Sequence, residues 1–541
     1  MKRIGTLLLC LLLLACMVLP AVSCKNKKKN GDDTTTPVQT APPTTDPTDP
    51  STDPPVVEPT KWDNVNFGGA TVKFQLSTND AEYTSGGKAY MAGPDETTSN
   101  TVQNLVYQRN SAARDVLGIN PTYVYWDKGW SQVFPEIETT ENTGNDCPDA
   151  YCDMIYDMMA ATMRGLFRNV KTLSVDYVAP DGSQGGYFDV RDEYGYMTEF
   201  MRDLALGTDK QYLLGNQYYM DLIRTMMVMP VNLDMYEAKC GDVSQFYQDI
   251  IDGEWTWDYL INLSKKVYTD KTGNGNSYDD ILGFAAETDG GMSASGIVYA
   301  TRVAIIDTEL QSDGTYLFTY KADNKALYDI FDKIKQVFSA NGVLAVTGQN
   351  GTTNTHVKQI REKFATDTLL FGGCIMMGAV EEEVYQDMNT QFGLVPIPKM
   401  SVEADYNTLI HNTGRCGAIS LHAQNPEAAS AWIQYCSENS GAIMNEYYNY
   451  AMKYKYTSDA GTMEMLDMIY ENIVSVREKA LEDLVGINSS DANQYKWHSM
   501  LIGSPRDYKS NADQIGTLYA TAIQVKQAEL DKLVKSWKNL P

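Results

Sequence analysis

The first 60 residues of this 541-residue chain pair an apolar leader with a polar, proline-rich segment, and neither composition can build a packed domain. Lys2 and Arg3 precede an apolar run from Ile4 to Leu19, and small residues follow it, which is the order of a secretory signal peptide. The next stretch is almost wholly Lys, Asn, Gly, Asp, Thr and Pro, so it has too few apolar side chains to form a core. We predict a signal peptide over 1–23, a disordered Thr/Asp/Pro-rich tether over 24–60 and a folded region over 61–541.

Cys24 directly follows the small residues, and this arrangement resembles the lipobox of bacterial lipoproteins, in which cleavage leaves an N-terminal cysteine that carries a diacylglycerol. Ala21 stands where that pattern prefers Leu, and Cys16 ends a competing match. Cleavage before Cys16 would leave an apolar stub, 17–22, ahead of four lysines, so Cys24 is the predicted lipidation site. The resemblance implies a lipid-anchored protein on the extracellular face of the cell membrane, with a proline-rich tether that extends by about 3 Å per residue.

The charge of the chain argues against two classes of partner. It carries 70 acidic and 44 basic residues, a formal net charge of -26, which opposes binding to nucleic acid and to anionic lipid surfaces. The four histidines form no HxxxH or HExxH pattern and the chain has no CxxC pair, so the sequence offers little support for a zinc site. We predict no cofactor. The 35 tyrosines provide flat apolar faces with a polar handle, a chemistry suited to sugar recognition, although core packing must account for most of them.

The periodicity of apolar residues alternates between strand and helix, which predicts an α/β sheet. Strand patterns cover 70–76, 121–125 and 152–156, and a helical stripe runs from Asn100 to Leu117, where Gly118 is expected to end the helix. Further helices are predicted from Thr256 to Val267 and from Pro426 onward, and the last third of the chain is rich in helical stripes. Such stripes are typical of core packing.

Several blocks in the middle of the chain resemble the extracellular solute-binding proteins of carbohydrate ABC importers. The blocks are Val231 to Glu237, Gly253-Glu254-Trp255-Thr256-Trp257-Asp258, Asp270 to Gly275, Gly283-Phe284, Gln391 to Lys399 and the Tyr447 to Ile469 region. Each block alone is weak, but their order matches the order in that family. The resemblance covers the chain in pieces from Arg109-Asn110 to about Ile473.

This resemblance implies a two-lobed periplasmic-binding-protein-like fold of type II, with a hinge between the lobes and a helix-rich C-terminal part. We place the first lobe at about 61–225 and 406–440, and the second at about 226–405 and 441–541, with crossings near Asp221 to Pro230 and Tyr406 to Ala418. The implied function is capture of a sugar or oligosaccharide in an interlobe cleft and delivery to an ABC permease, without enzymatic activity. Two alternatives stay open: a surface glycoside hydrolase, and a surface glycan adhesin without a transport role.

Polar residues that follow strands are the candidates for the ligand site, because strand ends and helix starts line the cleft in open α/β folds. The candidates are Thr78, Asn79, Asp80, Trp126, Asp157 and Arg415. For Asp157 a helix cap on the following segment fits the sequence equally well, and for Arg415 a lobe-to-lobe salt bridge does. For Trp126 the sequence favours a packing role over a ligand contact.

Asp270, Thr272 and Asn274 have the spacing of the first oxygen ligands in an EF-hand-like calcium loop, with Gly275 at the turn. Position 12 of that pattern is Ile281, so the usual bidentate Glu is missing. The sequence therefore leaves a structural calcium ion as a candidate and favours a hydrogen-bonded Asx turn without metal.

Overall fold

The structure is a computed structural model. It describes residues 62–63, 65–77, 87–129, 131–173, 177–178, 184–185, 198–287, 292–301, 306–312, 316–320, 325–346, 353–448, 460–473, 481 and 526–540. The chain divides into a compact unit from Thr60 to Pro541 and the segment before it, and the description below concerns the compact unit. The predicted signal peptide, Cys24 and the tether lie outside the described residues. None of the helices in the described ranges is long and apolar enough to cross a membrane.

The first sheet has the strand order β14-β3-β1-β2. Its members are β1 (Ala70–Ser77), β2 (Ile119–Trp126), β3 (Ala150–Met154) and β14 (Arg415–Ile419). β1 runs parallel to β2 and β3, and β14 pairs antiparallel with β3. Strand β14 comes from a part of the chain more than 250 residues beyond β3, so this sheet is assembled from segments that lie far apart in the sequence.

Helix α2 (Thr101–Leu117) covers this sheet and starts and ends where the sequence predicts. The Asn100 side chain accepts a hydrogen bond from the Gln103 amide, and Gly118 ends the helix at φ 59°, in the left-handed region that glycine tolerates best. Arg109 and Asn110 lie buried on this helix and hold the short π-helical segment η2 (Gly87–Ala92), because both side chains donate to the carbonyl of Met91.

The second sheet has the order β10-β7-β11-β6-β12, and β13 also pairs with β6. Its strands are β6 (Met227–Asn232), β7 (Leu282–Glu287), β10 (Val343–Val346), β11 (Leu369–Phe371), β12 (Ile375–Met376) and β13 (Phe392–Val395). β7 runs parallel to β10 and β11, whereas β6 is antiparallel to its three neighbours β11, β12 and β13. Each strand is short, and all of them except β10 at the end of the sheet are wholly buried, as expected for a sheet covered on both faces.

Helices pack around the second sheet and carry much of the motif that resembles solute-binding proteins. They are α7 (Leu233–Lys239), α8 (Val243–Ile251), α9 (Trp257–Val267), α10 (Met292–Ala300), α11 (Lys325–Ser339), α12 (Thr353–Ala365), α13 (Glu383–Gln386) and α16 (Ala460–Glu471). The predicted start of α9 is confirmed, since the Thr256 hydroxyl accepts from the Tyr259 amide. Trp255 and Trp257 are buried in the core.

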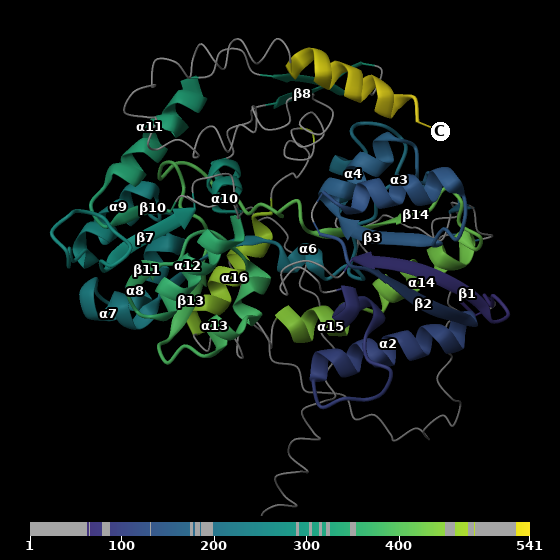
Figure 1. The fold of residues 1–541 in the computed structure, drawn as a ribbon, viewed down its shortest axis with the longest axis horizontal. Coiled ribbons are helices and arrows are strands. Elements are labelled where there is room, and N and C mark those ends of the chain that lie inside the picture. The colour runs from purple at the N-terminus through teal and green to yellow at the C-terminus, as the bar shows by residue number, and fades with distance from the viewer. Residues whose placement is uncertain are drawn as a thin grey trace, which may run out of the picture. The chain divides into compact units, whose positions relative to one another are not determined.

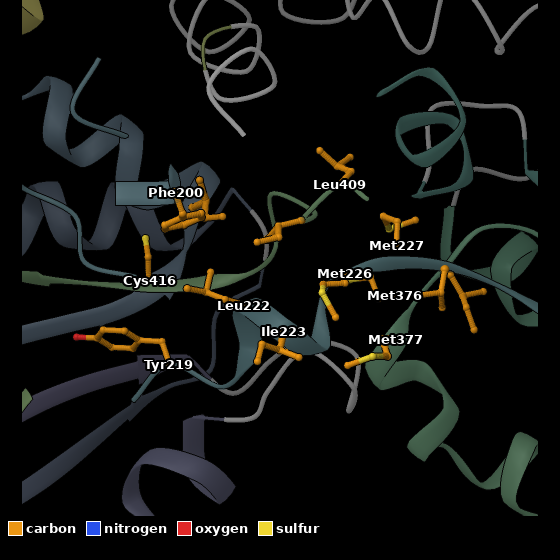
Figure 2. Packing of buried hydrophobic residues seen from close by; sticks show 14 of the residues in the cluster. Phe200, Tyr219, Leu222, Ile223, Met226, Met227, Met376, Met377, Leu409 and Cys416 are labelled. Carbon is orange, nitrogen blue, oxygen red and sulfur yellow. The ribbon is translucent and has the colours of Figure 1, made fainter. Parts of the chain in front are cut away.

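The two sheets are joined where two chain segments run side by side. Helix α6 (Asp221–Arg224) leads into β6, and Met226 forms an antiparallel bridge with Ile410 while the Met227 amide donates to the Leu409 carbonyl at 2.9 Å. Figure 2 shows the apolar packing at this crossing, to which Met226, Met227, Met376 and Met377 contribute. The crossing is therefore a two-segment connection in which four methionines pack together with branched residues such as Ile223 and Leu409.

Helices from the C-terminal part of the chain pack in both lobes. Helices α14 (Pro426–Glu438) and α15 (Gly441–Asn445) pack on α2, whereas α16 packs on β13. The last described helix, 526–538, contacts Tyr212, which lies beside the first sheet through the bridge of Leu214 to Gly417. The range that we placed in the second lobe, 441–541, thus includes two helices that pack on the first.

The start and the end of the third predicted strand both differ from the prediction. The strand expected over 152–156 is β3 (Ala150–Met154), and α4 (Ile155–Met163) begins directly after it, so Tyr156 and Asp157 belong to a helix. The apolar run Met154-Ile155 continues without a break from strand to helix, and periodicity alone cannot place a boundary inside such a run.

Candidate functional site

The candidate site lies at the edge of the first sheet where its parallel strands end. Ser77 is paired in register with Trp126, and Arg415 at the start of β14 lies opposite Met154 at the end of β3. Because β1, β2 and β3 are parallel, their last residues share one edge, and the antiparallel β14 adds its first residue to that edge. Strand ends in open α/β sheets are where ligands bind.

A charge network lies buried beneath this edge. Asp153 is fully buried and accepts hydrogen bonds from the Ser77 hydroxyl and, at 3.2 Å, from the Gln75 amide. Burial raises the pKa of Asp153, and the nearby Arg415 guanidinium and the hydrogen bonds oppose that shift. Arg415 itself is 1% exposed and donates to the Asp221 carboxylate at 3.2 Å. The network therefore links the edge of the sheet to helix α6 at the crossing.

Two half-buried aromatic side chains stand at the same edge. Trp126 packs edge to face on the buried Tyr151, with ring centroids 6.0 Å apart. Tyr156 lies in the first turn of α4, where its amide donates to the Asn412 carbonyl at 3.2 Å, so the loop that precedes β14 reaches it. An indole and a phenol beside hydrogen-bonding groups can stack on a sugar ring and satisfy its hydroxyls.

A second polar cluster joins the two lobes near the crossing. Arg224 at the end of α6 bonds to Asp221 at 2.6 Å and to Glu381 at 3.0 Å, where Glu381 ends the 3-10 segment η5 (Met377–Glu381) of the second lobe. The guanidinium lies over the Tyr90 ring, 5.1 Å from its centroid, and Tyr447 donates to Glu381 at 2.5 Å. Residues from η2, α6, η5 and the segment after α15 thus meet at one carboxylate.

The corresponding edge of the second sheet is built differently. Glu287, the last residue of β7, is 2% exposed and accepts hydrogen bonds from the amide and the hydroxyl of Ser293 at the start of α10. Burial raises the pKa of Glu287, and the hydrogen bonds from Ser293 oppose the shift. Nearby, Arg361 pairs with Glu382 at 2.6 Å. The Glu287 carboxylate therefore caps its own following helix, which is a local role.

The structure places the predicted site residues in different surroundings. Thr78, Asn79 and Asp80 lie outside the described residues. Trp126 is at the strand-end edge, where the sequence placed it. Arg415 lies under the edge and pairs with Asp221, so of the two interpretations its geometry favours the ion pair, here between the two segments of the crossing.

Asp157 is buried and its carboxylate is engaged by protein groups. It accepts from the Phe134 amide at 2.9 Å and from the Ser131 amide at 3.1 Å. These amides belong to the start of α3 (Val133–Thr143), so Asp157 caps the preceding helix, not the following segment that the sequence suggested. The cap comes from a different element, and such a long-range cap leaves no signal in local spacing.

The calcium-loop candidates are held by hydrogen bonds within their own loop. The Asp270 carboxylate accepts from the amides of Thr272, Gly273 and Gly275, and the Thr272 hydroxyl donates to the Asn274 side chain. These hydrogen bonds form an Asx turn at Asp270, which is the local structure that the sequence favours. Among the described residues, no three His, Cys, Asp or Glu side chains are grouped so that they could hold a metal ion.

Sequence reasoning missed Asp153, Asp221, Arg224 and Glu381. A signal was present for one of them: Asp153 stands between Cys152 and Met154 in an otherwise apolar strand, and a buried charge needs a partner. The identity of the partners was not accessible, because the ion pairs join segments about 160 and 190 residues apart.

Comparison with solved structures informs the fold, whereas no protein-family model matches the chain and no curated protein matches it in sequence. Among solved structures, the galacto-N-biose/lacto-N-biose I-binding protein of an ABC transporter from Bifidobacterium longum matches with a TM-score of 0.52 at 10% identity, over 86% of this chain and 98% of that one.

Two further structures have lower TM-scores. An ABC substrate-binding protein from Listeria monocytogenes in complex with cycloalternan matches at 0.48 and 12% identity, over 86% of this chain and 98% of that one. The maltose/maltodextrin-binding domain from Bdellovibrio bacteriovorus matches at 0.48 and 11% identity, over 86% and 100%. The Bifidobacterium match, together with the two sheets and their crossing, defines the class: this chain has the two-lobed, periplasmic-binding-protein-like α/β fold.

Proposed function

We propose that this protein is a lipid-anchored extracellular receptor that binds a sugar or an oligosaccharide between its lobes and delivers it to an ABC permease. The observation that carries the proposal is the strand-end edge of the first sheet. The half-buried Trp126 and Tyr156 and the buried Asp153 and Arg415 all lie at or next to the strand ends on this edge, and Arg415 pairs with Asp221 of the crossing. The order of the sequence blocks that resemble carbohydrate-binding proteins supports the same class of ligand.

The proposed mechanism needs no chemistry on the ligand. A ligand that contacts both lobes stabilises the closed arrangement by its higher affinity for that arrangement, and the closed form is the one a permease would accept. The predicted signal peptide and Cys24 would place the protein on the outer face of the membrane, and the tether of 24–60 would give it reach.

A thermal-shift screen tests the class of ligand. The chain from Lys25 to Pro541 would be heated with panels of oligosaccharides, peptides and amino acids, because a compound that binds only the native state raises the melting temperature. We expect a rise with one glycan class and recovery of that glycan uncleaved. Shortened glycan would instead establish the hydrolase. A rise only with peptides or amino acids would contradict the carbohydrate proposal.

A substitution then places the ligand. Trp126→Ala should weaken binding of the glycan found in the screen at least tenfold, since stacking of an aromatic face on a pyranose contributes a substantial part of such affinities. Tyr470→Ala, on the exposed face of α16, is the matched control and should leave the affinity unchanged. Equal affinities of the Trp126 variant and the unsubstituted chain, measured by calorimetry, would remove this edge from the ligand site.

A further inference from the structure

A β-hairpin that the chain inserts in the second lobe makes its contacts with the first. Strands β8 (Ile306–Leu310) and β9 (Tyr316–Tyr320) pair antiparallel and lie in sequence between α10 and α11, which both pack in the second lobe. Yet the Tyr316 ring lies on Gly207, so closely that a Cβ at Gly207 would come within 2.2 Å of the ring. Gly207, at φ +72°, belongs to the loop between α5 (Thr198–Leu204) and Tyr212 of the first lobe.

The C-terminal helix, 526–538, holds this hairpin through one side chain. Gln527 accepts a hydrogen bond from the Tyr320 amide at 2.8 Å and donates to the Phe318 carbonyl at 3.0 Å. The side-chain amide of Gln527 thereby makes the pair of hydrogen bonds to β9 that the backbone of a neighbouring strand would make. Figure 1 shows this helix beside β8, next to the labelled C-terminus.

The other end of the same helix is anchored in the first lobe. Trp537 is fully buried against Tyr212, with ring centroids 6.0 Å apart and an interplanar angle of 89°. The Lys210 ammonium donates to the Leu540 carbonyl, and the Leu540 side chain would contact a Cβ at Gly165 at 3.6 Å. The helix is thus attached to the first lobe at its end and to a second-lobe hairpin at its beginning.

We propose that the hairpin β8–β9 and helix 526–538 form an inter-lobe strap, a second link between the lobes in addition to the crossing at Met226 and Ile410. A rotation of the lobes about that crossing would have to carry the hairpin away from Gly207, or it would be limited by the length of the two four-residue links to α10 and α11, 302–305 and 321–324. A link of four residues spans at most about 14 Å. The strap therefore limits the range of interlobe angles. This inference depends on the fold and its contacts and not on the identity of any ligand.

Distance measurements between spin labels test the strap without a ligand. Labels would be placed at the exposed residues Asn142 on α3 and Ala238 on α7, in a chain without the predicted signal peptide that carries Cys24→Ser and Cys240→Ser. Cys240 is replaced because it is the half-buried cysteine, whereas the other five described cysteines are buried. We expect Gln527→Ala to broaden the distance distribution, and Lys535→Ala, exposed on the same helix, to leave it unchanged.

Hydrogen exchange shows whether the substitution has released the hairpin. The Tyr320 amide should exchange faster in the Gln527→Ala variant, because it loses its acceptor. Faster exchange with an unchanged distance distribution would overturn the strap, since the hairpin would then be free without any effect on the lobes. Trp537→Ala tests the attachment of the helix to the first lobe, and it too should broaden the distance distribution between the labels. This variant is informative only if its circular dichroism spectrum is native.

Discussion

The edges of the two sheets differ in how they accommodate a buried carboxylate. In the first lobe Asp153 lies near Arg415, which comes from the return segment of the crossing and pairs in turn with Asp221 of the outgoing segment. In the second lobe Glu287 is satisfied by Ser293, six residues further along the chain. The first edge is therefore coupled to the crossing by charge, whereas the second is a self-contained helix cap. Substitutions at the two edges should differ in size and in what they disturb.

The largest effect is expected for Arg415→Met. It removes the cation between two buried carboxylates, and a buried charge left without its partner costs about 3–5 kcal/mol. Urea-induced unfolding followed by circular dichroism measures the loss. Arg415→Lys is the matched control, because it keeps the charge but lacks the planar guanidinium. Its free energy of unfolding should lie between those of the unsubstituted chain and Arg415→Met. A loss below about 1 kcal/mol for Arg415→Met would mean that the network is not a structural ion pair and would erase the contrast between the edges.

A smaller effect is expected for Asp157→Ala. The change leaves the amides of Ser131 and Phe134 without their acceptor, and loss of such a cap costs about 1–2 kcal/mol. Unfolding in urea should show this loss, while Thr139→Ala on the exposed face of the same helix should cost much less. If Asp157→Ala kept full stability and lost ligand affinity instead, Asp157 would belong to the ligand site as the sequence first suggested.

Glu287→Gln should destabilise the protein by about 1 kcal/mol at neutral pH, because the amide nitrogen cannot accept one of the two hydrogen bonds from Ser293. The effect should depend on pH. Burial raises the pKa of Glu287 in the folded state above its unfolded value, so this group adds stability at low pH and loses that contribution as the pH rises through the folded-state pKa. The advantage of the unsubstituted chain over Glu287→Gln should therefore grow as the pH falls from neutral toward 4. If the difference in free energy of unfolding between the unsubstituted chain and Glu287→Gln became smaller as the pH fell, the raised pKa of Glu287 would be contradicted.

The smallest effects are expected at exposed ion pairs, and they should be alike in both lobes. Lys128 pairs with Glu136 in the first lobe and Lys325 with Asp329 in the second, and all four side chains are more than a third exposed. Replacing either lysine by alanine should change the free energy of unfolding by less than about 0.5 kcal/mol, because water and salt screen such pairs. A large change in one lobe only would show that the contrast between the lobes is not confined to buried charge.

The sequence predicts local structure well where the signal is local. Asn100 and Gly118 delimit α2 as expected, and Thr256 caps α9, because capping chemistry lies within a few residues of the helix end. The order of the blocks from Val231 to Lys399 gave the two-lobed fold. Boundaries inside continuous apolar runs, such as the end of β3, were misplaced because alternation does not change there.

The candidate site was predictable only in part. Trp126 could be placed at a strand end by its pattern, whereas the partners of Arg415 and Arg224 depend on which distant segments meet at the crossing. Asp157 shows the same limit, since the helix that it caps begins more than 20 residues before it. Long-range pairing is set by tertiary packing, and spacing in one sequence does not encode it in a readable way.

The methionine-rich packing at the crossing has a consequence for how the backbone there can turn. Met226, Met227, Met376 and Met377 are each at most 2% exposed, and their unbranched side chains have three rotatable bonds and a polarisable sulfur atom. When the backbone angle between the two segments changes, such side chains can switch rotamers and refill the space, whereas branched residues would leave voids or clash. Small rotations of the backbone at the crossing can therefore occur while the buried side chains stay packed, because the methionines change rotamer.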